Sequence, residues 1–164
     1  MTIHYSIADT GFGKVTLAST GQGICCVSFT DDPEKELSHR FRSASLILQE
    51  MPLHQRVVHI LNNWPDSAGQ LAEIPLHLMG TDFQVSVWNA LLKLKPGEKS
   101  TYKVIAAQAG RPTAVRATGT AIGQNPVAVL VPCHRVLTSS GKTGGYRWGT
   151  ALKLNLLAKE GKLK

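Results

Sequence analysis

The residues with the clearest chemical potential are Cys133 and His134, which directly follow the apolar run Val127–Val131. That run predicts a buried strand, so we expect Cys133 to stand at the end of a buried strand. Burial raises the pKa of a thiol, and only the thiolate attacks well. A reactive Cys133 therefore needs a group that draws off its proton.

His134 is the nearest candidate base, although neighbours in an extended strand point to opposite faces. The two side chains can communicate if the chain turns helical over residues 132–135, or if a water bridges them. A third group would then orient the imidazole, and the acids after residue 80 are Asp82, Glu98 and Glu160. The plainer interpretation is a buried structural cysteine beside a surface histidine.

Well-marked helices precede this pair. Thr81 and Gln84 have the spacing of a capping box at the start of a helix. A second helix is predicted over about Tyr102–Ala109 and a third over about Thr113–Ile122, separated by Gly110 and Pro112. Two short helices joined by a tight turn predict a helix-turn-helix.

The third of these helices has few bulky side chains, and Arg116 is its one long cation. Its small residues are Ala114, Ala117, Thr118, Gly119, Thr120 and Ala121. Such a helix either packs tightly against a neighbour or lies close to DNA with little side-chain bulk between them.

The first half predicts mixed strands and helices. Lys14–Ser19 and Ile24–Phe29 resemble strands joined by a hairpin turn at residues 21–23. Asp32-Pro33 marks the start of one helix. A second, amphipathic helix is predicted to end before Trp64-Pro65. Residues 69–79 are expected to hold a short strand or the link between two lobes.

Composition narrows the classes of protein. The chain has 164 residues, of which 43% are hydrophobic and 18% charged, which favours a folded domain over long disorder. No apolar run reaches the length of a membrane span, and no secretory signal is visible. Three cysteines cannot form a fully paired disulfide scaffold, so we expect a reducing, cytoplasmic setting.

The net charge of +7 is concentrated in the second half. Residues 1–80 hold 5 Lys or Arg and 8 Asp or Glu, whereas residues 81–164 hold 13 and 3, which gives net charges of −3 and +10. This asymmetry indicates that the second half binds a polyanion, most often nucleic acid, or that it has a solvated basic face.

The stretch Pro132–Val136 resembles the active-site signature of the O6-alkylguanine-DNA alkyltransferases, and Gly145–Gly149 adds a likeness to the C-terminal half of the bacterial Ada protein. Further elements follow the family's order and spacing: Phe83-Gln84, Val87-Trp88, Pro96-Gly97-Glu98, Tyr102, Ala114–Ala117, Asn125-Pro126 and Leu156–Gly161. The likeness is strong over about 80–161 and loose over 1–79.

The resemblance implies roles for particular residues. Cys133 would accept the alkyl group, His134 would act as base through a water, and Glu160 would hold the His134 tautomer. Asn125 would pin the turn before the active site, and Tyr102 would assist nucleotide rotation and stabilise the leaving guanine. DNA contacts would come from Arg116, Tyr102, Ala114, Ala117, Thr118, Thr120 and Arg135. The guanine pocket would be formed by Tyr146, Val136, Arg147, Trp148 and Gly149.

The implied fold is α+β, with a ribonuclease H-like α/β lobe over 1–79 and a mostly helical, winged helix-turn-helix-like lobe over 80–164. The first lobe would be structural, and the second would bind DNA and accept the alkyl group. The implied substrate is double-stranded DNA containing O6-alkylguanine, approached from the minor groove by a monomer with no membrane partner. We expect no metal, because Cys25 and Cys26 are adjacent and would face opposite ways on a strand. We also expect no cofactor, because the sequence shows no phosphate-binding glycine loop.

Three other classes stay open. A module that binds alkylated DNA without transfer would lack the cysteine at position 133. A helix-turn-helix transcription regulator would read the major groove with long polar side chains, which the third helix lacks. A cysteine hydrolase would need an oxyanion hole, for which no motif is evident.

Overall fold

The computed structural model describes residues 1–161 and has two compact units, Met1–Leu78 and a second that begins at Met79. The sequence analysis expected a division between residues 79 and 80. No helix in the described residues is both long and apolar enough to cross a membrane.

The first unit is built on a four-stranded sheet with the order β3-β2-β1-β4. Its strands are β1 (Thr2–Thr10), β2 (Gly13–Thr20), β3 (Gly23–Ser28) and β4 (Ser45–Leu48). β1, β2 and β3 are antiparallel, whereas β4 runs parallel to β1. The predicted hairpin is confirmed as the β2–β3 pair, and β1 is a strand that the sequence analysis did not identify.

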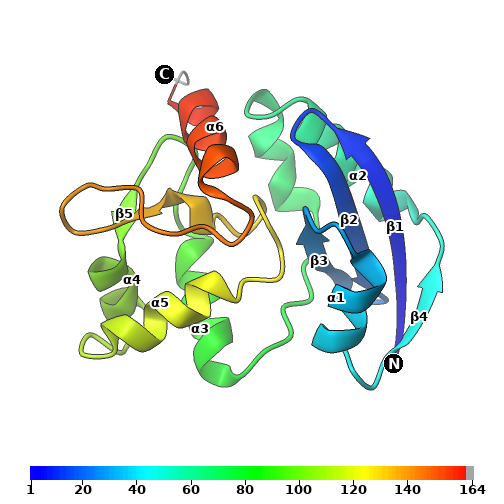
Figure 1. The fold of residues 1–164 in the computed structure, drawn as a ribbon, viewed down its shortest axis with the longest axis horizontal. Coiled ribbons are helices and arrows are strands. Elements are labelled where there is room, and N and C mark those ends of the chain that lie inside the picture. Colours follow the sequence, from blue (N-terminus) through cyan, green and yellow to red (C-terminus); the bar gives the residue numbers. More distant parts are fainter. Residues whose placement is uncertain (162–164) are drawn as a thin grey trace. The chain divides into compact units, whose positions relative to one another are not determined.

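Helices cover both faces of this sheet (Figure 1). They are α1 (Pro33–Arg40) and α2 (Pro52–Asn62), followed by the 3-10 helix η1 (Asp66–Glu73). Tyr5 of β1 donates a hydrogen bond to Glu34 of α1, and its neighbour Ser6 bonds His54 of α2. Since consecutive strand residues point to opposite faces, α1 and α2 lie on opposite faces. Residues 69–73, expected as strand or link, lie in η1, and Leu76 forms an isolated bridge with Ile24.

The second unit is mostly helical, so the mixed α+β fold is confirmed. Its helices are α3 (Asp82–Leu91), α4 (Tyr102–Gln108), α5 (Val115–Gly123) and α6 (Thr150–Glu160), with a 3-10 turn η2 (Cys133–Arg135). Two short parallel strands, β5 (Ser100–Thr101) and β6 (Val136–Leu137), complete it. Helices α3, α4 and α5 pack on one another, and α6 packs on η2 (Figure 1).

Local sequence signals account for these helices. The capping box is confirmed, because Thr81 Oγ1 accepts from the Gln84 amide at 3.1 Å and Gln84 returns a bond to the Thr81 amide at 2.9 Å. The helix-turn-helix is confirmed as α4 and α5, although α5 begins two residues later than expected. The Trp88 indole donates to the Ala121 carbonyl at 2.9 Å and fixes α3 against α5.

Candidate active site

Cys133 opens the 3-10 turn η2 and is only 5% exposed. Its sulfur accepts a hydrogen bond from Asn125 Nδ2 at 3.2 Å. Burial raises the pKa of the Cys133 thiol to about 11, although the Asn125 bond and the positive charge of Lys153 act in the opposite direction. Cys133 is therefore a thiol at neutral pH and needs a base.

The segment before Cys133 corrects one prediction. Val127–Val131 is not a strand but a fully buried turn in which Val129 has a φ of +68°. The Asn125 side chain supplies the hydrogen bonds that a sheet would give: its oxygen accepts from the Val127 amide, and Nδ2 donates to the carbonyls of Val127 and Val131. Because buried backbone groups must be paired, this one side chain permits an apolar run to turn.

His134 meets Glu160 in the interior of the unit. His134 Nε2 lies 2.7 Å from one carboxylate oxygen, and Arg135 Nε donates to the other oxygen at 2.8 Å. Burial alone would raise the pKa of Glu160, but hydrogen bonds from His134 and Arg135 lower it to about 2. Of the three candidate acids, Glu160 is therefore the one that contacts the imidazole, and it is ionised at neutral pH.

This contact fixes the tautomer of His134. An ionised carboxylate can only accept, so Nε2 must carry the hydrogen. Burial lowers the pKa of His134, although its hydrogen bond with Glu160 raises it. The neutral ring then has its lone pair on Nδ1, which is buried and has no hydrogen-bond partner among the described residues. His134 thus holds a free acceptor in the same 3-10 turn as the thiol.

A cavity of about 220 Å³ opens on Cys133. Aromatic and small residues form most of its wall: Tyr102, Gly119, Ile122, Gly123, Gly145 and Tyr146, together with Arg147. Burial raises the pKa of Tyr102 and raises that of Tyr146 well above its ordinary value, so both hydroxyls stay protonated. The Tyr146 hydroxyl is buried with no hydrogen-bond partner in the described part of the chain. The cavity thus offers proton donors close to a thiol.

The other expected pocket residues hold the loop that forms this wall. Arg147 donates to the Asn125 carbonyl at 3.2 Å and lies over the Trp148 ring at 5.1 Å. Trp148 meets Tyr146 edge to face, with ring centroids 5.4 Å apart. Gly149, at a φ of +103°, directs the chain into α6.

Lys153 is the residue that the sequence analysis missed. It is 0% exposed, and Nζ donates to the carbonyls of Val136 at 2.7 Å, Gly145 at 3.3 Å and Thr143. Lys153 therefore links α6 to β6 and to the loop of Thr143 and Gly145 that precedes α6. The sequence signal that could have revealed it is helical spacing, because Lys153, Leu156 and Glu160 recur at three- and four-residue intervals and share one buried face of α6.

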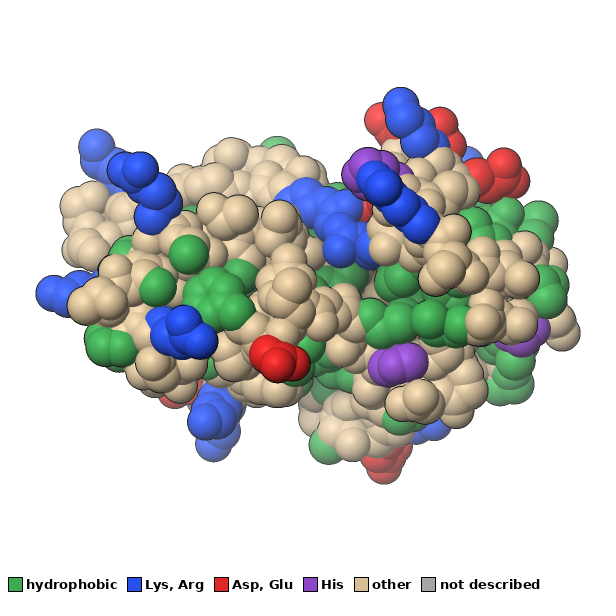
Figure 2. Space-filling view, turned by 90° about the horizontal axis from the view of Figure 1, so that it is seen from below, with side chains coloured by type: hydrophobic (Ala, Val, Ile, Leu, Met, Phe, Trp, Pro, Cys, Tyr) green, Lys and Arg blue, Asp and Glu red, His purple; other side chains and the backbone are tan. Residues whose placement is uncertain are grey.

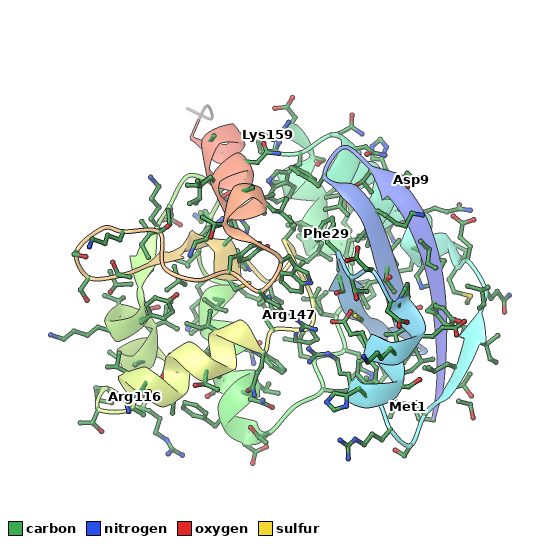
Figure 3. All side chains as sticks on the ribbon, in the orientation of Figure 1. Met1, Asp9, Phe29, Arg116, Arg147 and Lys159 are labelled. Carbon is green, nitrogen blue, oxygen red and sulfur yellow. The ribbon has the colours of Figure 1, made fainter. Side chains whose placement is uncertain are left out.

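The residues expected to contact DNA divide by burial. Arg116, labelled in Figure 3, is exposed on α5. Ala117 and Thr120 are also exposed on this helix, and Ala114 is half-buried just before it. Tyr102 begins α4 and is also half-buried.

The other two side chains differ from this picture. Thr118 and Arg135 are buried, so they do not lie on the surface where contacts with DNA were expected. Thr118 lies on the inner side of α5, and Arg135 is drawn inward by Glu160 and the Leu94 carbonyl, which accepts from it at 2.6 Å. Other lysine and arginine side chains are spread over the second unit, the one that contains α3 to α6, on the left in Figure 2. Among residues 1–161, no group of three His, Cys, Asp or Glu could hold a metal.

Comparison with known proteins places the chain in a family. Residues 82–162 match the model of the DNA-binding domain of 6-O-methylguanine DNA methyltransferase. The chain is 36% identical over 163 residues to the regulatory protein Ada of Salmonella typhimurium. The aligned region covers 98% of this chain but only 46% of that longer protein. It is 39% identical to the methylated-DNA–protein-cysteine methyltransferase of Mycobacterium tuberculosis, with coverage of 96% and 92%.

A solved structure agrees with this assignment. A crystal structure of Mycobacterium tuberculosis OGT in complex with DNA superposes with a TM-score of 0.76 at 36% identity, covering 96% of this chain and 92% of the other. Identity at this level over nearly the whole of both chains extends beyond the matched domain and includes the first unit. The chain belongs to the methylated-DNA–protein-cysteine methyltransferase family.

Proposed function

We propose that this protein repairs O6-alkylguanine in double-stranded DNA, mainly O6-methylguanine, by one irreversible transfer of the alkyl group to Cys133. The observation that carries the proposal is a buried thiol that faces a cavity, beside a histidine whose tautomer is set by an ionised glutamate. The names of the relatives, and the DNA held in one solved neighbour, support the same chemistry.

Transfer begins when the thiol loses its proton. Nδ1 of His134 accepts that proton, directly or through one water, and Glu160 stabilises the resulting imidazolium. The Asn125 hydrogen bond and the charge of Lys153 both favour the thiolate over the thiol. The thiolate then attacks the alkyl carbon, forming a carbon–sulfur bond as the carbon–oxygen bond to guanine breaks.

The leaving guanine gains electron density on its oxygen and needs a hydrogen-bond donor. Tyr102 and Tyr146 line the cavity with protonated hydroxyls and supply that donor. The thioether product cannot be reversed by thiol exchange, so each molecule acts once.

The alkylated base must leave the duplex, because its O6 atom is enclosed by base stacking. The exposed side of α5 suits a minor-groove approach, since Ala117 and Thr120 add little bulk there. Arg116 on the same helix would fill the gap left by the rotated nucleotide. The α3–α6 unit thus binds DNA and performs transfer as a monomer, and the first unit is structural.

The decisive test is stoichiometry with excess duplex that contains labelled O6-methylguanine. We expect one methyl group per chain, on the peptide that contains Cys133, and none in a Cys133→Ser variant. Sustained turnover, or label on Cys25 or Cys26, would refute the proposal. A companion binding assay should show affinity for duplex DNA falling steeply as salt rises, since phosphate contacts release counterions.

A further inference from the structure

The hydroxyl of Tyr102 rests against a glycine in the loop that precedes α6. This loop, residues 138–149, connects β6 to α6 (orange in Figure 1). A Cβ atom added at Gly144 would lie 3.0 Å from the Tyr102 hydroxyl oxygen and 3.5 Å from its Cε2 atom. Since contacts between carbon and oxygen are normally about 3.3 Å or longer, any larger residue would displace the hydroxyl by roughly 0.3 Å.

The opposite edge of the Tyr102 ring lies against a second glycine. A Cβ atom added at Gly119 of α5 would lie 3.6 Å from Cδ1 of the ring and 3.8 Å from Cε1, which are ordinary van der Waals distances. The ring therefore lies between α5 and the loop, with its hydroxyl against the loop. Because Tyr102 and Gly119 both line the cavity that opens on Cys133, the two glycines determine where the hydroxyl lies in that cavity.

Lys153 holds the loop at the point of this contact. Its buried ammonium donates to the carbonyls of Thr143 and Gly145, the residues on either side of Gly144. It also donates to the Val136 carbonyl of β6 at 2.7 Å. Gly144 itself has a φ of +69°, in the left-handed region that favours glycine. The hydroxyl of Tyr102 therefore meets a backbone held on both sides, which cannot move aside as a flexible side chain would.

We propose that Gly144 is a positioning residue for alkyl transfer, because its lack of a side chain lets the Tyr102 hydroxyl reach the leaving guanine oxygen. The inference rests on the proposed function and identifies what sets the position of its leaving-group donor. As the Cys133 sulfur bonds the alkyl carbon, the electron pair of the broken carbon–oxygen bond goes to the guanine. The hydroxyl donates a hydrogen bond to that oxygen and keeps its own proton. The guanine is neutralised by the proton that His134 took from the thiol.

The test compares Gly144→Ala with Gly141→Ala. Gly141 lies in the same loop at a φ of +83°, so both substitutions place alanine in a left-handed backbone, but a Cβ atom at Gly141 would meet no atom within 4 Å. The measured quantity is the rate of methyl transfer to Cys133 at saturating duplex, which separates the chemical step from DNA affinity. Because small misplacements of reacting groups are costly, we expect Gly144→Ala to slow transfer about tenfold and Gly141→Ala less than about twofold.

A double-mutant cycle with Tyr102→Phe shows whether the glycine acts through the hydroxyl. Phenylalanine lacks the oxygen that the added methyl group would meet, so Gly144→Ala should slow the Tyr102→Phe variant no more than Gly141→Ala does. This comparison within the Tyr102→Phe background also holds if Gly144→Ala alone is too unstable to assay. The pH dependence of transfer should be the same in Gly144→Ala and the wild-type protein, since Gly144 acts on the leaving group and not on the ionisation of Cys133.

Equal rates in Gly144→Ala and Gly141→Ala would overturn the inference, as would a loss that persists in the Tyr102→Phe background. A changed pH profile in Gly144→Ala would overturn it as well. In each of these cases, methyl transfer to Cys133 by the wild-type protein leaves the proposed function standing. Failure of the wild-type protein to transfer methyl to Cys133 would instead overturn the proposed function.

Discussion

Replacing Glu160 with glutamine would test how the base is set. In the wild-type protein one carboxylate oxygen accepts from His134 Nε2 at 2.7 Å and the other from Arg135 Nε at 2.8 Å. Glutamine has a similar shape but offers one accepting oxygen and one donating amino group. Because arginine cannot give up its proton, the amide oxygen turns to Arg135 and the amino group faces the imidazole. His134 then carries its proton on Nδ1, the atom that must accept from the thiol.

The substitution should change both the rate of transfer and the stability of the fold. A forced change of tautomer in a Ser-His-Asp triad lowers kcat about 10⁴-fold, so we expect alkyl transfer by Glu160→Gln to slow by roughly 10²- to 10⁴-fold. Removing one partner from a buried ion pair also costs about 3–5 kcal/mol of folding free energy. Glu98→Gln is the matched control, because Glu98 is exposed and only accepts from the Lys95 amide, as a glutamine can.

The assay measures the rate of methyl transfer to Cys133 from neutral pH upward, toward the thiol's pKa of about 11. Without a competent base, transfer depends on spontaneous ionisation of the thiol, so the rate of Glu160→Gln should rise with pH further than that of the wild-type protein. Thermal melting verifies that the variant is folded at the assay temperature. A folded variant with the wild-type rate and pH profile would remove Glu160 from the mechanism.

Three other changes probe the rest of the molecule. Arg116→Ala should impair transfer from duplex DNA more than transfer from free O6-benzylguanine, since a free base requires no opened stack; equal losses would assign Arg116 to the pocket. Lys153→Met leaves buried carbonyls unpaired, at about 1–3 kcal/mol each, and should raise the pKa of Cys133 in a pH–rate profile; an unchanged pKa would make its role only structural. Burial lowers the pKa of His54 to about 4, so the neutral form is favoured in the fold, and stability should fall as pH drops from about 6.5 toward 4, by about 2 kcal/mol near pH 5. His54 bonds both Ser6 and Ser19 at 2.8 Å, and His54→Gln should flatten that pH dependence in chemical denaturation.

Features encoded by neighbouring residues were predictable. The capping box at Thr81 and Gln84 satisfies its own amides, so its geometry follows from spacing alone. Asp32 similarly caps α1 by accepting from the Lys35 amide at 3.1 Å. The 3-10 turn that begins at Cys133 is the helical turn over residues 132–135 that the sequence offers as one way for the thiol to communicate with its neighbour.

Features that depend on distant partners were not predictable from local patterns. The apolar run Val127–Val131 has the composition of a strand, and it turns because the Asn125 amide replaces the missing sheet partners. Lysine is a residue type usually found at the surface, but Lys153 is buried because the carbonyls of Val136 and Gly145 accept hydrogen bonds from its ammonium. The small residues of α5 do not form one surface, because α5 also packs against α3 and α4, and Thr118 is buried on that side.

Helix α6 connects these separate features. Lys153 and Glu160 are seven residues apart, about two helical turns, and therefore share one face of α6. Through Lys153 the helix holds the carbonyls of the loop that shapes the cavity, and through Glu160 it holds the two side chains that follow the nucleophile. Lys153 near the start of that face thus sets the position of the cavity wall, and Glu160 near its end sets the tautomer of His134. Because both are rigidly linked by one helix, a shift of α6 would disturb the pocket and the proton acceptor at once.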